Sequence, residues 1–129
     1  MEPKLLYIDV ETNGIGKFRP ATQRMMQISW IFEDNEYNYF INDVESVSPD
    51  VPHDISTSFC KERGEDFDNV YNIFHGHLEN CDKVIAHNAE FDLGIISHEL
   101  KVRKHDKYKK YNKILKDLLE SDDVICTIK

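Results

Sequence analysis

Two short apolar runs in this sequence each stop at an acidic segment. Residues 5–8 lead into Asp9 and Glu11, and residues 84–86 lead into a segment that ends at Asp92. The first run predicts a buried strand, and residues two apart on a strand project from one face, so Asp9 and Glu11 converge. The second run predicts a strand followed by a helix whose first turn aims Asp92 back at the strand ends. We therefore expect three carboxylates at one edge of a sheet.

The hydrophobic pattern predicts three strands, followed by helices that alternate with strands. We expect strands at residues 4–12, 25–32 and 37–41, with a tight turn at Asp34-Asn35 between the last two. Apolar residues at helical spacing predict a helix of about four turns from Phe67 and further helices at residues 89–103 and 107–119. Short apolar runs predict strands at residues 83–86 and 124–128. This order predicts an α/β fold in which an antiparallel meander continues into parallel strands, with helices packed on the sheet.

Length and composition indicate a single globular domain without a membrane span or a disulfide framework. Its 129 residues, 40% of them hydrophobic, predict a single domain over residues 1–129. No apolar run approaches the length of a membrane span, and no basic stretch precedes a long apolar segment at the N-terminus, so we expect no membrane association. Three cysteines without paired spacing argue against a disulfide framework. We expect an intracellular, cytoplasmic protein, with a nuclear location left open.

Charge is distributed unevenly along the chain. The formal net charge is −8, yet residues 101–116 carry eight basic side chains and one acid. Lys109 and Lys110 lie at the centre of this segment, and Tyr108 and Tyr111 are interleaved with the cations. Aromatic rings beside cations suit single-stranded nucleic acid, through stacking and phosphate contacts. A solvated helix face is the alternative interpretation of the same pattern.

The two acidic segments resemble the motifs of a known enzyme superfamily. Asp9-x-Glu11-Thr12 followed by His87-Asn88-Ala89-x-Phe91-Asp92 resembles the first two motifs of the DnaQ-like DEDD 3′–5′ exonucleases, which include epsilon-subunit-type proofreading domains. Residues 51–56 resemble the family's His-Gly-Ile-Thr segment, residues 67–70 the start of its middle helix, and residues 126–128 its following strand. The resemblance covers nearly the whole chain and implies a ribonuclease H-like fold, with a mixed central sheet flanked by helices.

The resemblance also implies a metal-dependent centre. It makes Asp9, Glu11 and Asp92 the catalytic residues and the ligands of two divalent ions, Mg²⁺ or Mn²⁺. Asp9 bridges both ions, Glu11 serves the ion that activates water, and Asp92 supports the other. Carboxylate oxygens are the ligands these cations prefer, and two ions can stabilise the attacking and the leaving oxygen of a phosphodiester.

Four further residues are candidates for binding the terminal nucleotide. By resemblance, Thr12 contacts it through its backbone, and His53 lies near it, although Asp54 stands where the family usually has glycine. Asn88 has a second interpretation as a helix cap. Phe91 has a second interpretation as a core side chain.

The family's third motif, a His or Tyr followed four or five residues later by Asp, lies beyond the strand at Cys126, and Lys129 is the last residue of this sequence. His77 and Asp82 have similar spacing but precede the second motif, so we interpret them as coincidence. His75, His77 and Cys81 do not share one helix face, which argues against a zinc site. A fourth carboxylate from Asp117, Asp122, Asp123 or a partner chain is left open.

These observations predict a 3′–5′ exonuclease that releases nucleoside monophosphates from the 3′ end of single-stranded DNA or RNA, with DNA favoured. A polymerase or another replication protein is a candidate partner. The alternative is a truncated or catalytically impaired module of the same fold that binds nucleic acid or a replication partner.

Overall fold

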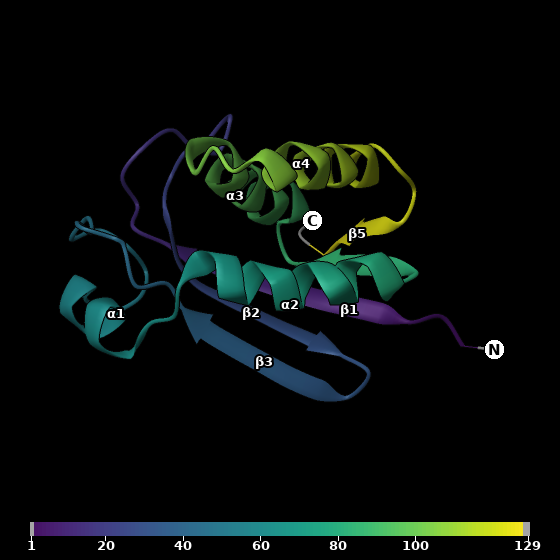
Figure 1. The fold of residues 1–129 in the computed structure, drawn as a ribbon, viewed down its shortest axis with the longest axis horizontal. Coiled ribbons are helices and arrows are strands. Elements are labelled where there is room, and N and C mark those ends of the chain that lie inside the picture. Colours follow the sequence, from purple (N-terminus) through teal and green to yellow (C-terminus); the bar gives the residue numbers. More distant parts are fainter. Residues whose placement is uncertain (1, 128–129) are drawn as a thin grey trace.

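The computed structural model describes residues 2–127, and its five strands form one mixed sheet in the order β3-β2-β1-β4-β5 (Figure 1). The strands are β1 (Leu5–Thr12), β2 (Met25–Phe32), β3 (Asn35–Phe40), β4 (Lys83–Ala86) and β5 (Val124–Cys126). β1, β2 and β3 pair antiparallel, while β4 pairs parallel with β1 and β5 parallel with β4. The predicted meander followed by parallel strands is confirmed. Residue 128, part of the strand expected at residues 124–128, lies outside the described residues.

The hairpin between β2 and β3 turns one residue earlier than predicted. Glu33 and Asp34 form the turn, with φ of 51° and 68°, and Asn35 pairs with Phe32 as the first residue of β3. Two consecutive positive φ angles are the mark of the type I′ turn that suits a two-residue hairpin. The predicted turn at Asp34-Asn35 is therefore wrong by one position. The observed register pairs Trp30 with Tyr37, and their rings stack 5.1 Å apart.

Four helices complete the described chain, and three of them were predicted. They are α1 (Thr57–Arg63), α2 (Phe67–Asn80), α3 (Ala89–Val102) and α4 (Asp106–Leu119). The short helix α1 was not predicted. Its N-cap, Ser56, accepts a hydrogen bond of 3.0 Å from the backbone N–H of Phe59, as serine commonly does at a helix start.

The core lies between one face of the sheet and helices α2, α3 and α4. Leu6, Ile8 and Val10 alternate with exposed residues along β1 and join the main buried cluster, as does Trp30 of β2. Alternation of this kind is expected for a strand with one buried face. Tyr7, on the other face of β1, is 44% exposed. β1 is thus a central strand, paired on one edge with β2 and on the other with β4.

Helices α3 and α4 lie side by side on the sheet, joined by a short connection (Figure 1). The first turn of α3 follows β4 directly, so it lies at the edge where β1 also ends. Among residues 2–127, the structure contains no helix of the length and apolar character needed to cross a membrane.

Candidate active site

A cleft of about 430 Å³ opens where β1 ends and α3 begins. It contains every residue that the sequence predicted for a catalytic or terminal-nucleotide role. These residues are Asp9, Glu11, Thr12, His53, Asn88, Phe91 and Asp92. Residues up to 83 positions apart in the sequence thus line one hollow, because strands β1 and β4 are parallel neighbours and end at the same edge.

The three predicted acids approach the cleft from two elements. Asp9 and Glu11 project from the same face of β1, and Asp92 comes from the first turn of α3, where it is only 4% exposed. Burial, and then the negative charges of Asp9 and Glu11, raise the pKa of Asp92 to about 7. Burial and the charge of Asp9 also raise the pKa of Glu11. The carboxylates therefore repel one another across a partly desolvated space.

A divalent cation fits the chemistry of this donor set. Asp50 also lines the cleft, so within residues 2–127 the lining has four carboxylates, two histidines and no thiol. Carboxylates are the ligand type that Mg²⁺ and Mn²⁺ prefer, and a cation would relieve the repulsion that, together with burial, raises the pKa of Asp92. The side chains are not gathered into a preformed cage: residues 2–127 contain no group of three or more His, Cys, Asp or Glu side chains placed to hold an ion.

His53 is fastened to the end of β1. Its Nε2 lies 2.6 Å from the carbonyl oxygen of Thr12, and its Nδ1 accepts a hydrogen bond of 3.2 Å from the Ile55 N–H. Since Nδ1 accepts, Nε2 carries the proton and donates to Thr12 in this arrangement. The Thr12 side chain is itself hydrogen-bonded to Gln23. The loop that contains His53 is thereby fixed against the strand that carries Asp9 and Glu11.

Asn88 precedes α3 as its N-cap residue but makes no side-chain capping hydrogen bond. Its half-buried amide lines the cleft instead. The backbone N–H groups in the first turn of a helix lack intrahelical partners, so the start of α3 offers donors to an anion. The neighbouring His87 carbonyl accepts a hydrogen bond of 3.4 Å from the thiol of Cys126, which ties β4 to β5 beside the cleft.

Phe91 lies at the cleft rim and stacks on a residue that the sequence did not predict. Its ring centroid is 4.9 Å from that of Phe18, with an interplanar angle of 17°, and Phe18 is 50% exposed. The Arg19 guanidinium lies 5.9 Å from the Phe18 ring. Phe18 belongs to the loop between β1 and β2, whose sequence has no periodicity that could have indicated this contact.

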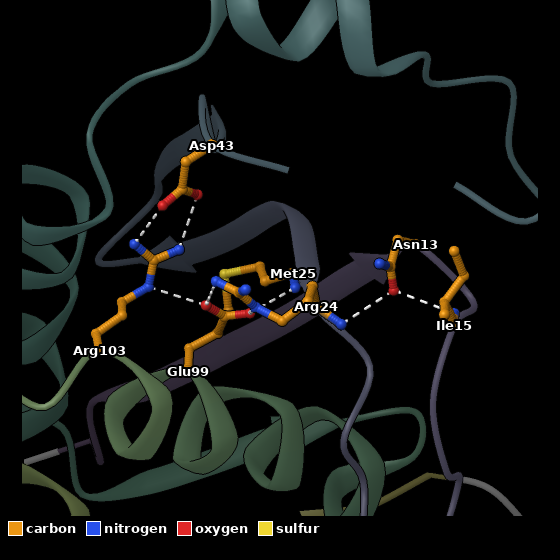
Figure 2. Close-up of polar contacts among 7 residues, drawn as sticks. All are labelled: Asn13, Ile15, Arg24, Met25, Asp43, Glu99 and Arg103. Carbon is orange, nitrogen blue, oxygen red and sulfur yellow. Dashed lines mark hydrogen bonds and ion pairs between the residues drawn. The ribbon is translucent and has the colours of Figure 1, made fainter. Parts of the chain in front are cut away.

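A buried ion network joins α3 to the start of β2, whose first residue pairs with Thr12 at the end of β1 (Figure 2). Glu99 of α3 is fully buried and accepts hydrogen bonds from the Arg24 side chain, at 2.8 and 3.1 Å, and from the Met25 N–H, at 2.8 Å. Arg103 donates to Glu99 at 2.9 Å and makes a bidentate pair with Asp43 at 2.8 and 2.9 Å. Each buried charge thus has opposite charges or donors around it.

The same network reaches the loop that follows β1, the strand that carries Asp9 and Glu11. The Asn13 side chain accepts hydrogen bonds from the backbone N–H groups of Arg24, at 3.0 Å, and Ile15, at 3.1 Å (Figure 2). The Asn13 N–H also donates to the Arg24 carbonyl at 2.9 Å. A continuous set of contacts therefore joins α3, the start of β2 and the residue that follows Thr12.

Lys109 and Lys110 do not line the cleft. Lys109 faces a separate hollow beside α3, whereas the charge of Lys110 acts on His75 of α2. His77, also on α2, accepts a hydrogen bond of 2.9 Å from the Trp30 indole and stacks on Phe32, so it packs against the sheet rather than in the cleft.

By sequence, no protein family and no curated protein matches the chain. By structure, the chain is similar to solved nucleases. E. coli exonuclease I bound to a dA16 oligonucleotide is 20% identical, with a TM-score of 0.63 over 83% of this chain and 25% of that one. Cell-death related nuclease 4 is 14% identical, with a TM-score of 0.56 over 93% of this chain and 50% of that one.

A family B DNA polymerase from Pyrobaculum calidifontis is also similar, at 13% identity and a TM-score of 0.52 over 80% of this chain and 11% of that one. The chain spans about a quarter of the length of the E. coli exonuclease I chains it matches. A zinc-bound form of E. coli exonuclease I with single-stranded DNA is also similar in structure. At these identities the likeness establishes the fold: the chain has the ribonuclease H-like fold that its sequence predicted, shared with these exonucleases.

Proposed function

We propose that this chain is a metal-dependent 3′–5′ exonuclease domain that hydrolyses single-stranded nucleic acid to nucleoside monophosphates. One observation carries the proposal. Asp9, Glu11 and Asp92 line a single cleft, and burial together with the charges of the other two acids raises the pKa of Asp92 to about 7. Such a concentration of negative charge suits a cation-binding centre better than a structural role.

The proposed roles follow from residue chemistry. Two divalent ions held by Asp9, Glu11 and Asp92 would supply Lewis-acid stabilisation and an activated water. Asn88 and the free N–H groups at the start of α3 are donors for a phosphate oxygen. Phe91, backed by Phe18, offers an aromatic surface on which the terminal base can stack. His53 holds the Thr12 carbonyl and so positions the peptide beside Glu11.

We propose DNA as the favoured substrate, because the similar E. coli exonuclease I structures include complexes with single-stranded DNA. A polymerase is the candidate partner, since a family B DNA polymerase contains the same fold within its chain. Both assignments rest on what those proteins bind or contain.

The test is degradation of a 5′-labelled single-stranded oligonucleotide with Mg²⁺ or Mn²⁺. The proposal requires a ladder that shortens from the 3′ end and stops when the 3′ hydroxyl is blocked by phosphate. A matched RNA oligonucleotide measures the preference for DNA. Internal cleavage, or equal cleavage of the blocked strand, would contradict the proposed polarity.

A second candidate function is binding without hydrolysis. It is favoured by one observation, the lack of a preformed metal cluster among residues 2–127. In this case, Asp9→Ala would leave the affinity for single strands in EDTA unchanged, and wild-type protein would produce no ladder with either metal. A ladder that Asp9→Ala abolishes would exclude this candidate.

A further inference from the structure

Three hollows extend from the candidate active site along the outer side of α3 and α4. The cleft shares Phe18, Asn88 and Phe91 with a small hollow that also contains Pro20 and Ala21. The last two residues also line a groove of about 200 Å³ between α3 and α4. That groove shares Lys101 with a further hollow of about 400 Å³ at the far end of the helix pair. Each hollow therefore adjoins the next through shared lining residues.

Lysine side chains line this path beyond the cleft. Lys101 and Lys116 line the middle groove, and Lys101, Lys104 and Lys109 line the far hollow. We call these four residues the lysine track. All four are exposed, and none of them takes part in an ion pair within residues 2–127. In contrast, Lys107 of α4 forms an ion pair in which its Nζ lies 2.7 Å from Oδ1 of Asp68.

The carboxylates on the path are few. Glu90 lines the small hollow and Asp106 the far one, while Glu99 is buried beneath α3 and neutralised by Arg24 and Arg103. The net charge of −8 opposes the binding of a polyanion, so a local excess of unpaired lysines is where one can bind.

We propose that the lysine track binds the phosphates of a single strand upstream of its 3′ end. This inference rests on the proposed function, because that function places the 3′ end in the cleft. The strand passes the exposed Phe18, which stacks on Phe91, and then follows α3 and α4 toward Lys104 and Lys109. α3 has 14 residues, a length of about 20 Å. At about 3.4 Å per stacked nucleotide, the far end of α3, where Lys101 lies, is about six nucleotides from the 3′ end.

The test is fluorescence anisotropy of 5′-fluorescein dT12 and dT4 with the full chain in EDTA, over a salt series. The test variant is Lys101→Ala with Lys109→Ala. The charge-matched control is Lys4→Ala with Lys113→Ala. Lys4 precedes β1 at the end opposite the cleft, and both control lysines already pair with carboxylates, Glu33 and Asp117. A second test variant, Lys101→Arg with Lys109→Arg, keeps the charge.

We expect the alanine test variant to bind dT12 about tenfold more weakly and to lower the salt slope by about 1.4, since each lost phosphate contact removes about 0.7. The control and the arginine variant should remain within about twofold of the wild type, and dT4 should respond to neither alanine pair. Equal losses in the test and control variants, an equal loss on dT4, or no binding of dT12 by the wild type would overturn the track.

The ladder assay keeps the two proposals apart. Lysine-dependent binding of dT12 without any degradation supports the track and removes the exonuclease. Degradation that is abolished by Asp9→Ala, together with dT12 binding that is insensitive to Lys101 and Lys109, removes the track and leaves the exonuclease standing.

Discussion

Asp92 combines burial with negatively charged neighbours, a placement that is unfavourable for an ionised carboxylate. It is 4% exposed, and burial followed by the charges of Asp9 and Glu11 raises its pKa from the usual 3.8 to about 7. The folded chain therefore holds this proton more tightly than the unfolded chain. The contribution of Asp92 to stability falls as pH rises from about 4 to about 7.

Replacing Asp92 with asparagine should separate stability from activity. In EDTA, Asp92→Asn should raise the melting temperature, and the gain should be larger at pH 8 than at pH 5, because only at the higher pH is the wild-type carboxylate fully charged in the fold. The same change should abolish degradation. Thermal melts at the two pH values measure the effect. If Asp92→Asn melted at a lower temperature than the wild type at pH 8, the charged Asp92 carboxylate would be stabilising the fold, contrary to this prediction.

Asp68 should show the opposite sign. Its carboxylate accepts hydrogen bonds from Lys107 and Tyr108, which lower its pKa below 3.8. Stability from this group is complete above its unfolded pKa and is lost as pH falls through the folded pKa. Asp68→Asn should cost roughly 1 kcal/mol at pH 7, a modest value because the side chain is partly exposed. Urea unfolding at pH 7 and pH 3 checks it: an equal cost at both would contradict the charge-based account.

At the scale of elements, the sequence pattern located β1, β2 and the long helices because each of these has one buried face. Alternation along β1 and helical spacing from Phe67 to Leu78 follow directly from that burial. The predicted position of the turn was one residue too late, because Glu33, Asp34 and Asn35 are all polar and either adjacent pair fits the pattern. Helix α1 was missed, because within it only Cys60 is buried, too few apolar positions to give a period.

The buried network around Glu99 could not be predicted, because its members are distant in sequence and each resembles a surface residue. Arg24 and Glu99 are separated by 75 positions. Only the fold brings them together, where β2 starts beneath α3. The sequence likewise indicated Phe91 but not Phe18, because their contact depends on the path of an irregular loop.

Removing Glu99 should destabilise the packing of α3 on the sheet. Glu99→Ala leaves Arg24 and Arg103 without their shared buried partner, and breaking a buried pair on one side costs about 3–5 kcal/mol. Lys113→Ala, which removes an exposed pair with Asp117, should change stability by less than about 0.5 kcal/mol. Urea denaturation of both variants gives the comparison. A cost below about 1 kcal/mol for Glu99→Ala would mean that the network contributes little.

Considering the molecule as a whole, the candidate site was more predictable than its surroundings. Its acids belong to motifs that end strands or begin a helix, and parallel strands bring such positions to one edge. The basic segment was also visible in the sequence, but its orientation was not. The structure separates Lys109, which lines the far hollow, from Lys110, whose charge acts on His75.

The proposed exonuclease activity depends most on Asp9, Glu11 and Asp92 forming one metal-dependent centre. The most direct measurement is the single-turnover rate of 3′-end removal with Mn²⁺ for Asp9→Asn, Glu11→Gln and Asp92→Asn, beside Asp54→Asn as a matched control. Asp54 is exposed and lies outside the cleft lining. We expect each of the first three changes to lower the rate by at least about a hundredfold, or about 2.7 kcal/mol, and the control to match the wild type. Equal rates for all four variants, or activity that persists in EDTA, would contradict a metal-dependent centre at these three residues.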